Sequence, residues 1–375
     1  MATLRAMSGA PRIALLRRID WPLLASAGIL LAGGLLALYS EGLGKEGGGN
    51  FRKQLLNMSL GLVPFVLFAW LDPAAWRRRA HALYIVNVLM LAAVLALGFR
   101  AGGAQRWLSL GPIQFQPSEL AKLFTVLTLA TFLASRQDSI RKLSTFGLSF
   151  LHMLLPVLLV FKQPHLGASL VMLAIWLSVS IAGGVPLRFV FGSVAVAAGV
   201  LGLAWVTPGV LHDYQKERVI AMFHSDVQEN GYQALRSEIA FGAGGVFGEG
   251  YLRGEQKQGR FIPEQNTDFI FTVIGEEGGL VGCVLVLGAF AFFFYRVWLV
   301  MLEADDPYAK MIAGGILGMM LFHTAVNLMM ILQMLPVVGL WLPFMSYGGT
   351  ALWLCMASVG LLLNVRARER PVLFG

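Results

Sequence analysis

The chain has 375 residues, of which 57% are hydrophobic and 13% are charged, and its mean hydropathy is +0.69. Soluble domains carry about 25% charged residues, so this composition excludes an ordinary water-soluble enzyme. The formal net charge is +8, but the 29 basic residues are spread through apolar sequence and form no basic face for nucleic acid. The two cysteines indicate neither a disulfide framework nor a zinc site. The composition predicts a polytopic membrane protein.

Ten stretches of the sequence are long and apolar enough to cross a bilayer, which takes about 20 residues of helix. They cover residues 21–39, 53–71, 80–98, 118–135, 146–162, 166–184, 188–206, 268–296, 310–332 and 341–363. The first stretch reaches full length without a clear cleavage site, so we expect a membrane helix rather than a removed signal peptide. The eighth is overlong, which indicates either a tilt or first turns outside the hydrocarbon core. The sequence predicts an all-α polytopic fold with ten transmembrane helices.

The positions of lysine and arginine predict the orientation. With a cytoplasmic N-terminus, most basic residues, including those at 77–79 and 366–370, fall on the inner face. We therefore expect both termini to be cytoplasmic, with residues 1–20 before the first helix and 364–375 after the last. The segment 207–267 then becomes one long extracytoplasmic loop between helices 7 and 8. We expect the whole chain, 1–375, to form a single transmembrane domain.

Two of the segments between predicted helices have a composition that is unusual for a simple connection. Residues 99–117 are too polar to span the membrane and too apolar to be a free loop. Residues 207–267 combine charges and a glycine cluster at 242–250 with apolar side chains. Loops of this length are usually functional or disordered, and this composition favours an ordered segment that re-enters or lies on the bilayer. The glycines do not match a phosphate-binding loop, so we interpret them as tight turns near the membrane surface.

Charged residues inside predicted spans are costly in lipid and therefore suggest functional sites. Glu119 and Lys122 are three residues apart at the start of the fourth stretch, so they share a helix face and can pair. A purely structural ion pair and a functional pair remain equally open. Glu276 and Glu277 lie two turns into the eighth stretch, where we expect one of them to pair within the bundle.

Asp268 opens the eighth stretch at the predicted outer face, where it is either a helix N-cap or a functional acid. The same face carries the Arg106–Trp107 hairpin and the long-loop cations Arg218 and Arg260. An acid near several cations suits sugar transfer from an anionic lipid-linked substrate, because the acid can take a proton from the attacking hydroxyl while the cations neutralise a phosphate leaving group. A transporter or flippase fits these residues equally well.

Six motifs, in order along the chain, resemble a known family. They are GAQRWLSLGPIQFQPSELAK (103–122), QPHLGAS (163–169), YQKERVIAMF (214–223), GYQALRSEIAFGAGGVFGEG (231–250), IPEQNTDFIFTVIGEEGG (262–279) and LPVVGLWLPFMSYGGT (335–350). They resemble the SEDS family of shape, elongation, division and sporulation proteins, from Asp20-Trp21 to about Asn364. Within that family, Asp20-Trp21 and residues 336–339 resemble the rod-elongation branch, RodA, more than the division branch, FtsW.

The resemblance implies a ten-helix membrane fold and peptidoglycan glycosyltransferase activity. Proteins of this family polymerise lipid II, a disaccharide-pentapeptide on undecaprenyl pyrophosphate, into a growing glycan strand on the outer side of the bacterial cytoplasmic membrane. The resemblance also implies a class B penicillin-binding protein, a transpeptidase, as partner. It further suggests Mg²⁺ or Mn²⁺ as cofactor, although no metal-ligand spacing in the sequence supports a cation. No nucleic-acid partner is expected.

The essential aspartate of the family falls on Asp268, which we expect to be the general base. The pyrophosphate is expected to be held by some of the cations, and Glu119 is expected to pair with Lys122. The residues expected to bind the substrate are Arg106, Trp107, Glu119, Lys122, Arg218, Arg260 and Glu264.

Four positions depart from the family pattern: His165 replaces Asp, Arg236 replaces Gln, Glu249 replaces Lys and Asn266 replaces His. None of them alters Asp268, so they bear on substrate contacts rather than on the expected reaction. The rival hypotheses are a lipid II flippase, an FtsW-type division polymerase and a non-catalytic scaffold. A flippase needs a polar path through the bundle, whereas most ionisable residues are predicted at the outer face. A scaffold would tolerate the loss of Asp268.

Overall fold

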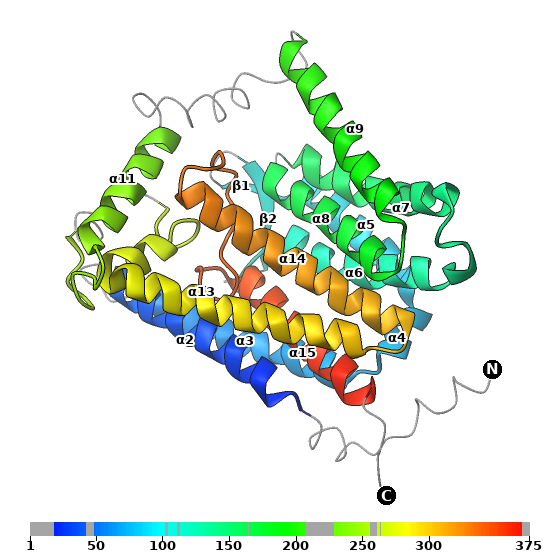
Figure 1. The fold of residues 1–375 in the computed structure, drawn as a ribbon, viewed down its shortest axis with the longest axis horizontal. Coiled ribbons are helices and arrows are strands. Elements are labelled where there is room, and N and C mark those ends of the chain that lie inside the picture. Colours follow the sequence, from blue (N-terminus) through cyan, green and yellow to red (C-terminus); the bar gives the residue numbers. More distant parts are fainter. Residues whose placement is uncertain are drawn as a thin grey trace, which may run out of the picture.

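The computed structural model describes residues 19–42, 49–101, 104–110, 113–163, 165–207, 229–255, 261–262 and 264–369. This part of the chain is predominantly helical, and most of the long helices pack into one bundle (Figure 1). The helices are α2 (Trp21–Gly42), α3 (Gly49–Trp70), α4 (Pro73–Arg78), α5 (Ala80–Leu97), α6 (Pro117–Ala134), α7 (Leu143–Lys162), α8 (Leu166–Ala182), α9 (Leu187–Val206), α11 (Glu229–Gly244), α13 (Phe271–Glu303), α14 (Pro307–Ile331) and α15 (Gly349–Glu369).

Nine helices within the described ranges are long and apolar enough to cross a membrane. The apolar helix α8, which corresponds to the predicted stretch 166–184, has 17 residues and is shorter than these nine. Several boundaries differ from the predictions, and α15 begins at Gly349 rather than at residue 341. Helix α13 begins at Phe271, so Asp268 lies before it, and α15 continues to Glu369, which makes the first residues of the predicted tail helical.

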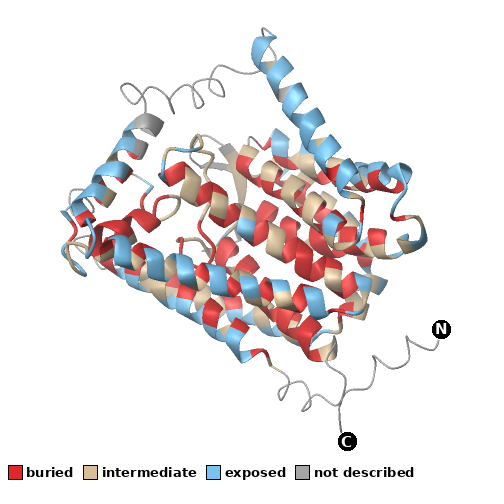
Figure 2. Cartoon of the chain, viewed as in Figure 1, coloured by how far each residue is buried: buried red, intermediate tan, exposed pale blue. Residues whose placement is uncertain are grey.

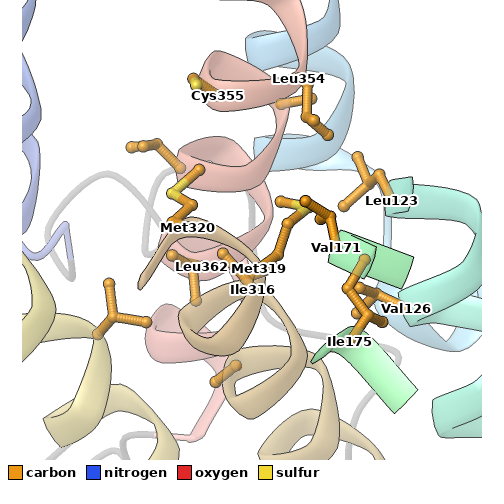
Figure 3. Packing of buried hydrophobic residues seen from close by; sticks show 14 of the residues in the cluster. Leu123, Val126, Val171, Ile175, Ile316, Met319, Met320, Leu354, Cys355 and Leu362 are labelled. Atoms are coloured by element: carbon orange, nitrogen blue, oxygen red, sulfur yellow. The ribbon is translucent and has the colours of Figure 1, made fainter. Parts of the chain in front are cut away.

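The buried hydrophobic residues form a continuous core along the middle of the bundle, while the outer sides and α9 are exposed (Figure 2). Burial is greatest on α6, α14 and α15. Figure 3 shows side chains of four helices meeting in this core, namely Leu123, Val126, Val171, Ile175, Ile316, Met319, Met320, Leu354, Cys355 and Leu362. Helix α6 therefore carries Glu119 and Lys122 into the most enclosed part of the protein.

A small antiparallel sheet interrupts the helical fold and corrects the all-α prediction. Its strands are β1 (Phe99–Ala101), β2 (Ala104–Leu110) and β3 (Ile113–Phe115), with β2 in the centre. This segment is too polar to span a membrane, and strand pairing satisfies its backbone groups instead. Arg106 and Trp107 lie on β2, and α6 begins with Pro117 directly after β3.

Both described ends of the chain lie at the same end of the bundle. Arg296 of α13 donates to the carboxylate of Asp20, just before α2, at 2.6 Å. Arg366 of α15 lies 3.6 Å from the same carboxylate and also pairs with Glu303 of α13. These ion pairs join α2, α13 and α15 at the end opposite Asp268.

Helix α13 is broken at Gly279, whose φ of 61° and ψ of −160° are not helical. The backbone N–H groups of Leu280 and Val281 donate to the carbonyls of Gly245 (2.9 Å) and Val246 (3.1 Å). In return, the N–H groups of residues 249 and 250 donate to the carbonyls of residues 276 and 277, at 3.0 and 3.1 Å. The glycine-rich segment after α11 thus satisfies the groups that the break exposes, as irregular backbone at membrane depth requires.

Replacing Gly279 by alanine should destabilise the protein. A Cβ atom at this position would collide with the backbone of Gly248 and Val246, and the positive φ is strained for any residue with a side chain. We expect a loss of about 1–3 kcal/mol in the free energy of unfolding, measured as a lower thermal midpoint in detergent. Gly278→Ala is the matched control, because a Cβ there meets nothing within 4 Å. Equal midpoints for the two variants would contradict the prediction.

Candidate active site

Asp268 lies in a turn segment, residues 264–270, that leads into α13. Its backbone N–H donates to the carbonyl of Glu264 at 3.1 Å. Ile270, rather than Asp268, occupies the N-cap position of α13, so the N-cap interpretation of Asp268 is wrong. The aspartate is half-buried.

The carboxylate of Asp268 faces the backbone of Gly339. A Cβ atom added to Gly339 would lie 3.4 Å from Oδ2 of Asp268. Gly339 also has a φ of 70°, in the left-handed region that favours glycine. The backbone conformation therefore favours glycine beside the carboxylate, and a Cβ atom at this position would lie in close van der Waals contact with the acid.

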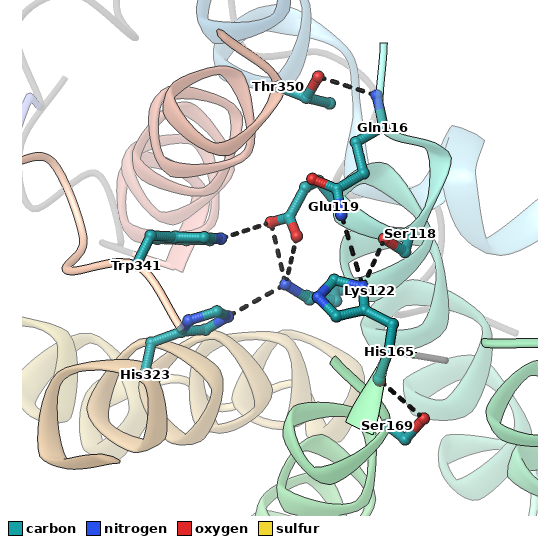
Figure 4. Close-up of polar contacts among 9 residues, drawn as sticks. All are labelled: Gln116, Ser118, Glu119, Lys122, His165, Ser169, His323, Trp341 and Thr350. Atoms are coloured by element: carbon teal, nitrogen blue, oxygen red, sulfur yellow. Dashed lines mark hydrogen bonds and ion pairs between the residues drawn. The ribbon is translucent and has the colours of Figure 1, made fainter. Parts of the chain in front are cut away.

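Glu119 and Lys122 form a buried ion pair on α6, which confirms the predicted pairing (Figure 4). Nζ of Lys122 lies 2.8 and 2.9 Å from the two carboxylate oxygens of Glu119 and 3.1 Å from Nε2 of His323 on α14. The indole N–H of Trp341 donates to Glu119 at 3.0 Å, and its ring stacks on His323 with centroids 3.9 Å apart. These four residues, which we call the buried polar cluster, join α6, α14 and the stretch after α14.

His165 lies beside this cluster, just before α8. Its Nδ1 is 3.4 Å from both the Gln116 amide nitrogen and the Ser118 hydroxyl (Figure 4). Burial, and then the positive charges of Arg106 and Lys122, lower the pKa of His165 well below its usual value of 6.5. The imidazole is therefore neutral at pH 7, and Nδ1 can accept hydrogen bonds from the two neighbouring groups. This departure from the family pattern places an uncharged ring at position 165.

The remaining predicted residues are spread over the rim of the site. Arg106 donates from Nε to the carbonyl of Gln163 at 3.4 Å, and its charge acts on His165. Trp107 lies next to it on β2 and is half-buried. Glu264 is exposed and accepts a hydrogen bond from Thr267 at 3.2 Å. Two further predicted residues lie outside the described part of the chain, namely Arg218 and Arg260.

Three polar residues of this region escaped the sequence analysis. His323 and Trp341 complete the buried polar cluster, and Asn327 of α14 donates to the backbone carbonyl of Asp268 at 2.7 Å. A signal for two of them was present, since His323 and Asn327 are polar residues inside a predicted span. No three His, Cys, Asp or Glu side chains among the described residues are arranged to hold a metal ion.

The segment 339–341 connects Asp268 to the buried polar cluster, because Gly339 faces the carboxylate and Trp341 donates to Glu119. A family model described as cell cycle protein, which covers FtsW, RodA and SpoVE, matches residues 15–371. The chain belongs to this family. The match extends over nearly all of the sequence and confirms the resemblance that the six motifs indicated.

Curated relatives carry the names of both functional branches. The peptidoglycan glycosyltransferase MrdB of Escherichia coli K12 is 36% identical over 324 residues, which cover 86% of this chain and 87% of the relative. A probable peptidoglycan glycosyltransferase FtsW of Trichlorobacter lovleyi is 34% identical over 322 residues, which cover 84% of this chain and 83% of the relative. Their similar identities do not separate an elongation role from a division role.

A solved structure shares the fold. A chain from a study entitled "Structural coordination of polymerization and crosslinking by a peptidoglycan synthase complex" matches with a TM-score of 0.80 and 32% sequence identity. The alignment covers 94% of this chain and 98% of that chain. The arrangement of helices described above is therefore the arrangement of an experimentally determined relative.

Proposed function

We propose that this protein is a peptidoglycan glycosyltransferase that polymerises lipid II at the outer face of the bacterial cytoplasmic membrane. The single observation that carries the proposal is the position of Asp268, a half-buried acid that lies just before α13 with its carboxylate against the backbone of Gly339. The names of the curated relatives support the reaction class. We further propose ten membrane crossings, α8 included, with both termini in the cytoplasm, which agrees with the ion pairs that join Asp20 to Arg296 and Arg366.

In the proposed reaction, Asp268 orients and deprotonates the 4-hydroxyl of the GlcNAc unit of lipid II. The hydroxyl oxygen attacks the anomeric carbon of the lipid-linked strand from the side opposite the pyrophosphate. A new C–O bond forms as the bond to the pyrophosphate oxygen breaks, and undecaprenyl pyrophosphate leaves with the electron pair. The α-linkage is thereby inverted to a β-1,4-linkage, as in inverting glycosidases with a sugar hydroxyl in place of water.

The buried polar cluster and the rim have different roles in this proposal. Lys122 is fully buried, and its ammonium already has three partner atoms. It therefore acts through Glu119 and Trp341, by fixing the stretch that contains Gly339. The pyrophosphate and sugar contacts fall to residues at the rim or outside the described ranges, namely Arg106, Trp107, Arg218, Arg260 and Glu264.

A divalent cation is proposed on the family resemblance alone. The described residues offer no cluster of donors for Mg²⁺ or Mn²⁺, so no step of the reaction is assigned to an ion here. Chelation of the purified protein with EDTA, followed by addition of either metal, tests the requirement. Loss of polymer on chelation and its return with the metal would support the cation.

We also propose a class B penicillin-binding protein as partner and a role in cell elongation. The partner is supported by the solved relative, whose title places polymerisation and crosslinking in one synthase complex. The elongation role is supported by Asp20-Trp21 and residues 336–339, which resemble RodA-type sequences.

The decisive experiment is polymerisation of purified lipid II by the full-length protein in detergent, with and without a class B partner. Glycan ladders on a gel are the expected result. If no condition gives polymer and the protein instead translocates lipid II across liposomes, the flippase hypothesis replaces the proposed function.

A further inference from the structure

The segment that carries Asp268 is held by its backbone. Three consecutive carbonyls, those of residues 266, 267 and 268, each accept a hydrogen bond from a different residue elsewhere in the chain. The donors are the backbone N–H of Tyr347 (2.8 Å), the hydroxyl of Ser346 (2.5 Å) and the side-chain amide of Asn327 (2.7 Å). A chain segment bound at three successive peptide groups has little freedom to shift or rotate.

Asn327 occupies a special place among these donors. It is fully buried on α14, and its Nδ2 makes a second hydrogen bond, at 2.6 Å, to the carbonyl of Leu340. Leu340 follows Gly339, the residue that faces the carboxylate of Asp268. One amide group therefore joins the segment that carries the acid to the segment that forms the wall beside it. The separation between these two segments depends on this side chain.

We propose that Asn327 is a positioning residue that sets the place of the Asp268 carboxylate in the active site, with Ser346 as a second, weaker contributor. This inference rests on the proposed function, in which Asp268 is the base. Asn327 does not touch the reacting atoms. It acts by holding the carbonyl of Asp268 and the Gly339–Leu340 backbone at a fixed distance. Displacement of a catalytic group by about 1 Å can cost about 10²-fold in rate.

The test compares Asn327→Ala with Asn364→Ala in the full-length protein. Asn364 of α15 is a closely matched control, because it is also buried and also donates from Nδ2 to two backbone carbonyls, those of Phe68 (2.9 Å) and Leu71 (2.5 Å). It lies near the ion pairs at the opposite end of the bundle, where its neighbour Arg366 pairs with Asp20. Asn327→Ala loses two hydrogen bonds, whereas Asn364→Ala loses three, because Oδ1 of Asn364 also accepts from Nε of Arg368 at 2.7 Å. A general loss of packing should therefore affect the control at least as much.

We expect Asn327→Ala to lower kcat for lipid II polymerisation by about 10- to 100-fold, with less than about a threefold change in KM, and we expect Asn364→Ala to keep kcat within about twofold per folded molecule. Equal kcat values for the two variants would overturn the proposal. If Asn327→Ala does not fold, Ser346→Ala takes its place, with Ser358→Ala as control. Ser358 is a buried serine of α15 whose hydroxyl has no partner among the described residues. Ser346→Ala must then lower kcat more than its control does.

Hydrogen exchange gives a readout that does not depend on the reaction. Asn327→Ala should raise deuterium uptake in peptides covering residues 264–272, whereas Asn364→Ala should leave these peptides unchanged. Unchanged uptake at 264–272 in Asn327→Ala would overturn the positioning role even in an inactive protein. If the wild-type protein makes no polymer but Asn327→Ala still raises uptake at 264–272, the positioning of Asp268 is retained and the proposed function is rejected.

Discussion

Polymerisation of lipid II should fall by at least about 10²- to 10⁴-fold when Asp268 is replaced by asparagine. Asparagine has nearly the same shape but cannot take a proton from the attacking hydroxyl. The fold should survive, because the contacts of residues 266–268 with Asn327, Ser346 and Tyr347 use backbone carbonyls that asparagine retains. The measurement is the initial rate of glycan synthesis by purified protein whose thermal midpoint matches that of the wild type.

Two further variants test whether the loss of activity is specific to the carboxylate at position 268. Asp305→Asn makes the same chemical change at an exposed position between α13 and α14, and it should leave the rate unchanged. Asp268→Glu keeps the carboxylate but extends it by one methylene group beside the backbone of Gly339, so we expect a partial loss. If Asp268→Asn polymerises lipid II at a rate near that of the wild type, Asp268 is not the base.

The second large effect is expected on stability, when Lys122 is replaced by methionine. The substitution leaves the carboxylate of Glu119 buried with the indole N–H of Trp341 as its donor. Breaking a buried ion pair by removing one partner costs about 3–5 kcal/mol. We therefore expect a thermal midpoint lower by many degrees, together with reduced polymerisation, because Trp341 lies two residues from Gly339.

The double variant Glu119→Gln/Lys122→Met separates charge from packing. It removes both charges and retains an oxygen for Trp341, so most of the lost stability should return. Arg77→Met is the control for an exposed pair, since Arg77 lies 3.8 Å from Asp306 with both side chains partly exposed. Its effect should stay below about 1 kcal/mol. A double variant as unstable as Lys122→Met alone would refute the electrostatic explanation.

The positions of the helices were predictable because one physical constraint fixes them. A bilayer demands about 20 apolar residues per crossing, and the ten apolar stretches correspond to ten helices of the structure. The Glu119–Lys122 pair was predictable for a similar reason, since residues three apart share a helix face. Both features depend only on residues that are close together in the sequence.

Contacts between distant segments could not be predicted in this way. Trp341 donates to Glu119, which is 222 positions away in the sequence. The amide of Asn327 donates to Asp268, just before α13, and to Leu340, after α14. The break at Gly279 was also hidden, because residues 278–294 are all glycine or apolar and read as continuous helix. Its cause is the docking of residues 245–250, and no local pattern announces that contact.

The segment 266–268 is held through its backbone carbonyls, and this affects which side-chain substitutions are tolerated near Asp268. At positions 266 and 267 the groups that bind Tyr347 and Ser346 belong to the main chain, and every amino acid supplies them. The side chain at 266, an asparagine here where the family pattern has histidine, can therefore vary while the path of the chain stays the same. The contacts depend instead on the side chains of the donors Asn327 and Ser346.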